Sequence, residues 1–202
     1  MRQGDAGSVA PGSQPAADPR LALADAGRVQ GDSSAQVWLV MASDFQCPAC
    51  KYWHESQSAE VMRDFVATGK VKFAYINYPL DQHQNAVPAS EAAMCAAAQG
   101  RFWPMHDRIF ATQEQWSTSP DAVSQFRQLA NEAGVDTTAW QQCLDNDVML
   151  PLIAGDRDRA NAGGVYQTPT FFIGTQVVSG AVPYARMRPL LDSAVARAGS
   201  GR

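Results

Sequence analysis

Residues 37–50 read VWLVMASDFQCPAC. The first five, Val37 to Met41, form a nearly continuous apolar run, which is typical of a strand buried on both faces. Pro48 follows Cys47 at a position where a missing N–H is harmless, and helix-forming residues continue to Thr68, before Gly69. The two cysteines therefore open a helix that follows a strand.

A second strand is predicted shortly after this helix. Residues 71–77 alternate in polarity and are followed by the turn-prone pair Tyr78-Pro79. Strand, helix and strand in this order form a parallel βαβ unit. The chain is therefore expected to have an α/β fold.

Residues 79–164 show no convincing strand signal and predict a helical lobe. Helices are expected over residues 88–99, 119–134, 136–144 and 148–162. Strand signals return at residues 170–173 and 176–178, which form a hairpin around Gly174.

A last helix is predicted from Pro183 to the C-terminal region. One face of it carries the apolar residues Met187, Leu190, Leu191, Ala194 and Val195. Pro189 lies inside the pattern and is expected to kink or delay the helix.

Charge and composition exclude several classes of partner. The chain has 16 basic and 20 acidic side chains and a formal charge of −4, so no broad positive field attracts nucleic acid or anionic lipid. No stretch approaches the roughly 20 apolar residues that a transmembrane helix needs, and no signal peptide is recognisable. These features predict a soluble chain that does not bind nucleic acid.

Residues 1–30 are rich in Gly, Ala, Asp, Ser and Pro and contain few large apolar side chains. Such a composition buries too little surface to order itself, so residues 1–30 are expected to be a flexible leader. A leader of this kind often connects a domain to an export signal or membrane anchor, and such a segment upstream of Met1 is a hypothesis.

The cysteines at positions 47 and 50 form a pair that can switch between dithiol and disulfide. Their spacing places both sulfurs on the first turn of a helix, close enough to form a small ring. Unpaired N–H groups and the positive end of the helix dipole stabilise a thiolate at Cys47 and lower its pKa. A stabilised thiolate makes the corresponding disulfide a better oxidant, which favours donation of disulfides.

A Cys-x-x-Cys pair can also be half of a zinc site, or a plain structural disulfide. A zinc site needs a second pair of ligands, and the chain has no second Cys-x-x-Cys and only three histidines. His54, one turn after Cys50, is the only obvious third ligand. We therefore predict no metal site, and keep a copper or zinc carrier using Cys47, Cys50 and His54 as the alternative outside enzymes.

Two segments resemble the DsbA-like branch of the thioredoxin superfamily. They are residues 43–50, SDFQCPAC, and residues 168–172, TPTFF, and the resemblance extends over about residues 35–196. It implies a thioredoxin-like fold formed by residues 31–78 and 165–202, with residues 79–164 as an inserted helical domain. It also implies that Cys47 is the exposed attacking thiol and Cys50 the buried resolving thiol, with no cofactor beyond this redox-active disulfide.

The resemblance further implies a role for the second segment. Pro169 is expected to be cis and to face the dithiol, and the Thr168 backbone is expected to pair with an extended substrate segment. An ordinary turn proline is the alternative. Between the cysteines, Pro48-Ala49 replaces the Pro-His of the best-known oxidase of the family, and Thr168 replaces its Val, so the oxidising strength stays open.

Cys95 and Cys143 both fall in the helical lobe, and some DsbA-like relatives carry a second cysteine pair of this kind. We predict a structural disulfide between them, and two buried free thiols are the alternative. A disulfide there also predicts an oxidising compartment, so the chain is expected to act outside the cytoplasm, in the periplasm or cell envelope.

Other side chains near the dithiol have two possible roles each. Asp44 can accept a proton and tune the dithiol, or cap the turn before it. The aromatic residues Phe45, Tyr52 and Trp53 can form an apolar surface for unfolded substrates, or belong to the core. We expect Lys51 and Glu55 to be solvated.

The two remaining histidines carry no catalytic signal. His106 shares a helical stripe with large apolar residues and is expected in the core. His83 falls in a predicted loop.

Together these features predict a monomeric thiol:disulfide oxidase. Its substrates would be unfolded or reduced exported proteins, and the resemblance implies a quinone-linked membrane partner of the DsbB or vitamin K epoxide reductase type as reoxidant. A reductase or isomerase on the same fold is the alternative among enzymes. Isomerase relatives dimerise through a folded N-terminal domain, which the polar leader is too short to supply.

Overall fold

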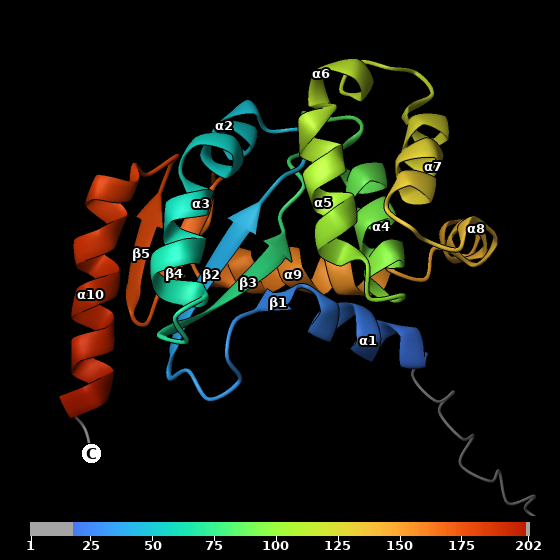
Figure 1. Ribbon diagram of the computed structural model, residues 1–202. Helices are drawn as coiled ribbons and strands as arrows, with labels where there is room; N and C mark the ends of the chain where they lie inside the picture. The colour runs from blue at the N-terminus through green and yellow to red at the C-terminus, as the bar shows by residue number, and fades with distance from the viewer. Residues whose placement is uncertain (1–17, 201–202) are drawn as a thin grey trace, which may run out of the picture.

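A mixed sheet of five strands lies at the centre of the computed structural model, which describes residues 18–200 (Figure 1). The strand order is β1-β3-β2-β4-β5, and only β2 and β3 run parallel. The strands are β1 (Val29–Gln30), β2 (Val37–Ser43), β3 (Val71–Asn77), β4 (Thr170–Ile173) and β5 (Gln176–Ser179). The predicted βαβ unit and the C-terminal hairpin are confirmed.

Strand β2 is buried on one face along its first half and on both faces at its end. Leu39 and Met41 are buried, whereas Trp38 is 41% exposed and Lys72 Nζ lies over its ring at 4.5 Å. From Met41 to Ser43 every side chain is buried. The prediction of burial on both faces over residues 37–41 was therefore wrong for the start of the strand, where only Lys72 covers Trp38.

The helix that begins after Cys47 is shorter than predicted. It divides into α2 (Pro48–Ser56), α3 (Ser58–Val61) and a π-helical turn, η1 (Met62–Val66). The hydroxyls of Ser56 and Ser58 donate to the carbonyls of Tyr52 and His54, four residues back, a pattern that bends helices. Gly69, with φ +71°, ends the segment in the left-handed conformation that glycine allows.

The inserted helices lie together at one end of the sheet (Figure 1). They are α4 (Ala86–Ala97), α5 (Phe102–Ala111), α6 (Gln113–Trp116), α7 (Ala122–Glu132), α8 (Thr137–Asp145) and α9 (Leu150–Ala162). Asp136 caps α8 at the predicted boundary by accepting from the N–H of Thr138, whereas α7 begins at Ala122, with Asp121 as its cap, and not at Ser119 as predicted. Helix α9 leaves the group and packs against β3.

The segment predicted to be a flexible leader is partly ordered. Residues 1–17 lie outside the described residues, but Pro19–Gly27 forms helix α1 and β1 pairs antiparallel with β3. Asp18 caps α1 by accepting from the N–H of Arg20 at 2.9 Å. Composition alone missed this order, because a buried charge holds the segment together with a few small apolar contacts such as that of Ala24 in the core.

That charge is Arg28, whose guanidinium pairs with the fully buried carboxylate of Asp156 on α9. Asp156 also accepts from the backbone N–H and side-chain amide of Asn77, at 2.9 and 3.0 Å, and from Arg159 at 2.6 Å. A buried carboxylate needs such partners, since an unpaired one costs several kcal/mol. Asp156 thus joins the segment before β1, the end of β3 and α9.

The last helix, α10 (Tyr184–Ser200), begins upstream of Pro189, so the proline does not delay it. Pro189 removes a single N–H from the first turns, while Met187, Leu191 and Ala194 remain buried. Among residues 18–200, no helix has both the length and the apolarity to cross a bilayer.

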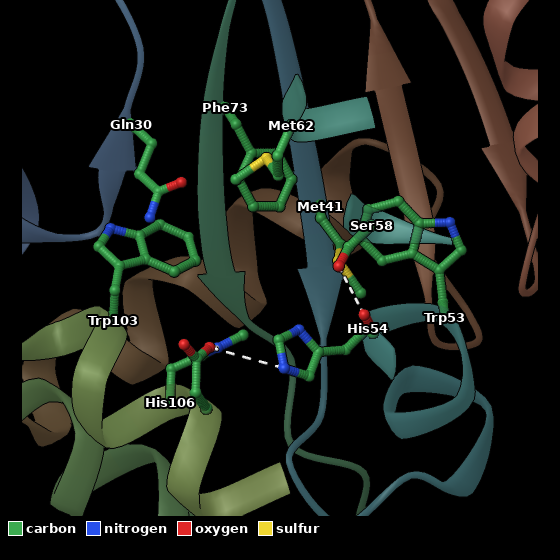
Figure 2. A pocket seen from close by; sticks show the side chains of 10 residues that line it. Gln30, Met41, Trp53, His54, Ser58, Met62, Phe73, Trp103 and His106 are labelled. Carbon is green, nitrogen blue, oxygen red and sulfur yellow. Dashed lines mark hydrogen bonds and ion pairs between the residues drawn. The ribbon is translucent and has the colours of Figure 1, made fainter. Parts of the chain in front are cut away.

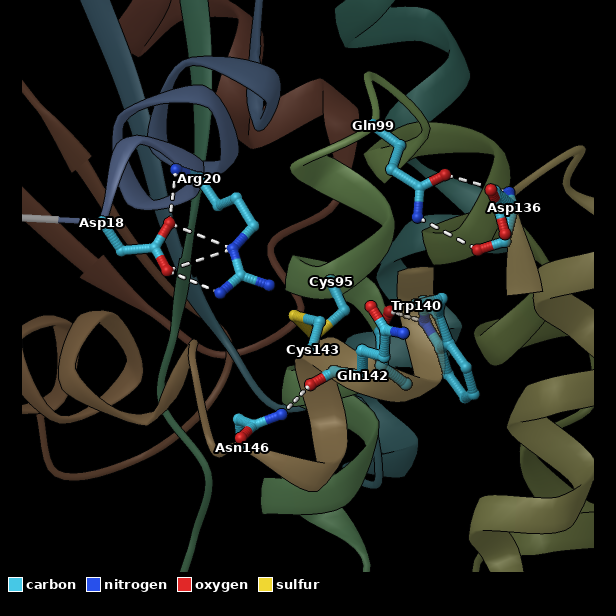
Figure 3. The surroundings of a disulfide bond; sticks show 10 residues. Asp18, Arg20, Cys95, Gln99, Asp136, Trp140, Gln142, Cys143 and Asn146 are labelled. Atoms are coloured by element: carbon cyan, nitrogen blue, oxygen red, sulfur yellow. Dashed lines mark hydrogen bonds and ion pairs between the residues drawn. A yellow bond between two sulfur atoms is a disulfide. The ribbon is translucent and has the colours of Figure 1, made fainter. Parts of the chain in front are cut away.

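A disulfide joins Cys95 of α4 to Cys143 of α8 (Figure 3). Both sulfurs are buried, and beside them the indole of Trp140 donates to the carbonyl of Ala92 at 2.9 Å. The bridge closes a loop with a sequence separation of 48 residues inside the helical insert.

We expect removal of this bridge to lower the free energy of unfolding by about 4 kcal/mol, the chain-entropy value for a loop of this length. The measurement is urea unfolding of Cys47→Ala/Cys50→Ala against the same variant with Cys95→Ala/Cys143→Ala added. The first variant serves as the control, because it keeps only the structural pair. Equal unfolding midpoints for the two variants would contradict the prediction.

Candidate active site

The two redox cysteines occupy the first turn of α2 at the carboxyl end of β2. Cys47 is the N-cap residue of α2, with φ −74° and ψ 121°, and Pro48 takes the first helical position, where it loses no hydrogen bond. Both cysteines are free thiols in the structure. The Cys47 side chain retains 7% exposure and Cys50 retains none.

The surroundings of Cys47 stabilise its thiolate. A hydrogen bond from the Cys50 thiol is the largest cause, and the N–H groups of Cys50 and Ala49 add to it. Partial burial opposes these effects, and the pKa of Cys47 falls to about 6. This thiol is therefore largely ionised at neutral pH, as a nucleophile and leaving group must be.

Cys50 has the opposite character. Complete burial is the main cause that raises its pKa well above the ordinary value, and the neighbouring Cys47 raises it further. The pair thus consists of a nearly buried sulfur, not the exposed one that was predicted, which ionises readily, and a fully enclosed sulfur that stays protonated.

A loop from the distant C-terminal part faces the dithiol. The Thr168–Pro169 peptide bond is cis, and Cys47 Sγ lies 3.6 Å from the carbonyl oxygen of Thr168. The Thr168 hydroxyl is buried and has no hydrogen-bond partner among the described residues. Tyr166, just before this loop, is 78% exposed.

Asp44 is a turn cap with three partners. Its Oδ1 accepts from the N–H of Gln46 at 2.7 Å, and its Oδ2 accepts from the N–H of Leu80 at 2.9 Å and lies 2.7 Å from His83 Nδ1. Burial is the largest cause that shifts the pKa of Asp44, and it raises this pKa above the usual range. Of its two predicted roles, the geometry supports the cap.

His83 was expected to carry no role, but it contacts this buried carboxylate. The sequence offers no signal for the contact, because the loop that carries His83 lies 39 residues after Asp44.

The aromatic residues around the dithiol divide between core and surface. Phe45 and Trp53 are buried, and the Trp53 indole donates to the carbonyl of Val182. Of the two roles left open by the sequence, Phe45 and Trp53 take the core one, and only Tyr52, 57% exposed, can contribute to an apolar surface. Lys51 is less solvated than expected, because it contacts Glu114 and Glu55.

A groove of about 520 Å³ runs beside the start of α2. Its lining residues come from α2, the loop after β3 and α6, and include Gln46, Pro48, Tyr52, His83, Gln113 and Ser117. The groove is therefore formed jointly by the thioredoxin-like part and the helical insert.

The set Cys47, Cys50 and His54 that a metal carrier would use is not assembled. His54 lies instead with His106 and Asp107 of α5. His106 is in the core, as predicted, where it contacts aromatic rings.

Gln113 is a buried residue of the site that sequence reasoning missed. Its side-chain amide donates to the carbonyl of Phe45 at 2.6 Å and to that of Cys47 at 3.1 Å. These bonds hold the backbone just before α2 against α6. Gln113 follows Cys47 by 66 residues in the chain.

We expect Gln113→Ala to lower the free energy of unfolding by about 1–3 kcal/mol, because the Phe45 carbonyl loses its side-chain donor and the Cys47 carbonyl keeps only the N–H groups of Cys50 and Lys51. Gln115→Ala, at an exposed position of the same helix, is the matched control and should change stability by less than about 0.5 kcal/mol. Chemical denaturation of both variants measures the difference. Equal effects would show that Gln113 does not support the loop.

We also expect thiolate absorbance of the reduced protein to show one step near pH 6, from Cys47, while Cys50 stays protonated far above it. Cys47→Ser should remove the step near pH 6. Two thiols that both titrate at the ordinary cysteine value of about 8.5 would contradict this assignment.

Comparison with known proteins agrees with this site. Residues 24–193 match the family model described as Thioredoxin. Disulfide bond formation protein D of Bacillus subtilis is 21% identical over 169 residues, which are 81% of this chain and 75% of that protein. The Na(+)/H(+) antiporter NhaA 3 of Salinispora tropica is 31% identical over 179 residues, which are 82% of this chain but only 26% of the antiporter. The chain thus spans about a quarter of that relative.

Two solved structures have the same fold. Oxidised BdbD from Bacillus subtilis superposes with a TM-score of 0.77 at 21% identity, over 85% of this chain and 94% of that one. Alpha-DsbA1 of Wolbachia pipientis gives 0.76 at 19% identity, over 86% and 93%. Because the family match covers most of the sequence, the chain belongs to the thioredoxin family, and its fold, inserted helices included, is that of these two structures.

Proposed function

We propose that this protein is a thiol:disulfide oxidoreductase that donates the Cys47–Cys50 disulfide to reduced exported proteins. The observation that carries the proposal is the difference between the two sulfurs: Cys47 retains 7% exposure and has a pKa of about 6, and Cys50 is enclosed with a raised pKa. The names of relatives such as disulfide bond formation protein D support the same class of chemistry.

The proposed reaction has two exchange steps. In the first, a substrate thiolate attacks Cys47 Sγ of the disulfide, the bond to Cys50 breaks, and Cys50 leaves and takes up a proton. In the second, another substrate thiolate attacks the substrate sulfur of the mixed disulfide, and Cys47 leaves as a stabilised thiolate. Two electrons pass from the substrate to the dithiol, and no further cofactor is needed.

The Thr168–Pro169 loop would hold the substrate during this exchange. The Thr168 carbonyl lies beside Cys47 and precedes β4, so an extended peptide can add its backbone there as another strand. The groove beside α2 is open to the side chains of such a peptide.

Oxidation is favoured over reduction by the stabilised thiolate. Any contact that favours the thiolate form of Cys47 stabilises the reduced protein and makes its disulfide more oxidising. The pKa of about 6 is lower than that of the reductant thioredoxin, about 7, and higher than that of the strong oxidase DsbA, about 3.5. An oxidant of intermediate strength follows from these values.

We also propose where the protein works and which partner reoxidises it. The Cys95–Cys143 bridge suits an oxidising compartment outside the cytoplasm. A quinone-linked membrane protein of the DsbB or vitamin K epoxide reductase type would reoxidise the dithiol. We propose that the protein works as a monomer.

The test is the reduction potential of the Cys47–Cys50 couple, measured by equilibration with glutathione. We expect a value between those of thioredoxin and DsbA, about −270 and −120 mV. The disulfide form should also restore activity to reduced, unfolded ribonuclease, and Cys47→Ser should abolish this activity. Cys50→Ser cannot form the internal disulfide, and with glutathione disulfide as the oxidant it should accumulate a mixed disulfide on Cys47 instead.

A potential at or below that of thioredoxin would reject the oxidase and favour the reductase. Reactivation of ribonuclease with scrambled disulfides, without activity on the reduced enzyme, would favour the isomerase.

A further inference from the structure

Two imidazoles and a carboxylate converge on one point outside the dithiol site. His54 belongs to α2, one turn after Cys50, and His106 and Asp107 belong to α5. Asp107 Oδ1 lies 3.5 Å from His54 Nε2 and 2.9 Å from His106 Nδ1. One ligand atom from each residue lies within 4.8 Å of the other two.

Packing fixes the two rings in this arrangement. The His106 side chain is 5% exposed and contacts the rings of Phe45 and Phe102. His54 stacks on Phe110 at 5.2 Å and stands perpendicular to His106 at a centroid distance of 4.7 Å. Rings held in this way lose little side-chain freedom on binding a ligand.

A cavity of about 240 Å³ gives access to the cluster (Figure 2). Besides the three residues, the thioethers of Met41 and Met62 and the hydroxyl of Ser58 line it. The Asp107 side chain is 60% exposed, so solvent can supply a further ligand on that side. The cavity is thus open and leaves room for an ion with incomplete protein coordination.

The donor set selects a class of ion. Two imidazole nitrogens and one carboxylate oxygen are ligands of Zn²⁺ and Cu²⁺, whereas Ca²⁺ and Mg²⁺ prefer oxygen ligands alone. For a given set of nitrogen and oxygen ligands Cu²⁺ binds more tightly than Zn²⁺. We propose that His54, His106 and Asp107 form a site for a divalent transition-metal ion, with Cu²⁺ preferred, which does not use the redox cysteines.

The sequence predicts no metal site, because no second ligand pair lies near the Cys-x-x-Cys pair. The fold supplies the missing ligands from α5 of the helical insert. A bound ion would therefore connect the helix that carries Cys50 to the inserted domain. The competing interpretation is a core histidine beside two weak surface ion pairs, which would bind no metal.

The test uses Cys47→Ser/Cys50→Ser as the parent, because free thiols bind and reduce Cu²⁺. Titration with Cu²⁺ followed by calorimetry should show one equivalent, electron paramagnetic resonance should show imidazole nitrogen ligands, and the melting temperature should rise. Zn²⁺ should compete for the same site with lower affinity.

His54→Gln and Asp107→Asn in this parent should each weaken Cu²⁺ binding by more than about tenfold, since even loss of a residue that only supports a ligand costs about 10–100-fold. His83→Gln is the matched control, because it removes a histidine outside the cluster, and it should bind as the parent does. Asp107→Asn changes an exposed side chain, so it keeps the test decisive if His54→Gln is poorly folded.

Two results would overturn the proposal. One is the lack of saturable Cu²⁺ binding by the folded parent. The other is binding that persists unchanged in Asp107→Asn and in folded His54→Gln, because the ion would then be held by other groups.

Discussion

The pairing of β2 with both β3 and β4 is the constraint on which the site depends. A parallel pair needs a crossover on one face of the sheet, and here that crossover begins with α2 at the carboxyl end of β2. Strand β4 pairs antiparallel with β2 in the register Ala42 to Thr170, so the residues before Thr170 lie next to the end of β2. The pairing of the strands therefore brings the cysteine pair and the Thr168–Pro169 loop together, although 121 residues separate Cys47 from Thr168 in the chain.

The features that could be predicted from the sequence are those encoded locally. The apolar run before Cys47, the alternation in residues 71–77 and the helix start at Asp136 are each visible within a few residues, and the structure contains a strand or a helix at each of them. The resemblance added the position of Pro169, which no local pattern supplies.

The remainder depends on contacts between distant residues. Arg28 orders the segment before β1 by pairing with Asp156, 128 positions later, so the composition of residues 1–30 gave the wrong expectation. His83 and Gln113 join the site through Asp44 and Cys47, at separations of 39 and 66 residues. Trp53 is buried because α2 turns that face to the sheet, and an aromatic near a helix start does not by itself reveal this.

The burial of Cys50 has a consequence for the identity of every covalent partner. A molecule from solution can reach only Cys47, so each partner must be attached through the same sulfur and must lie along the same side of the Thr168 carbonyl. The burial of Cys50 thus determines from which side a partner approaches, whatever the difference in reactivity between the two thiols. In the function that we propose, substrate and reoxidant would therefore bind at this one sulfur in turn, and neither could be bound covalently while the other is present.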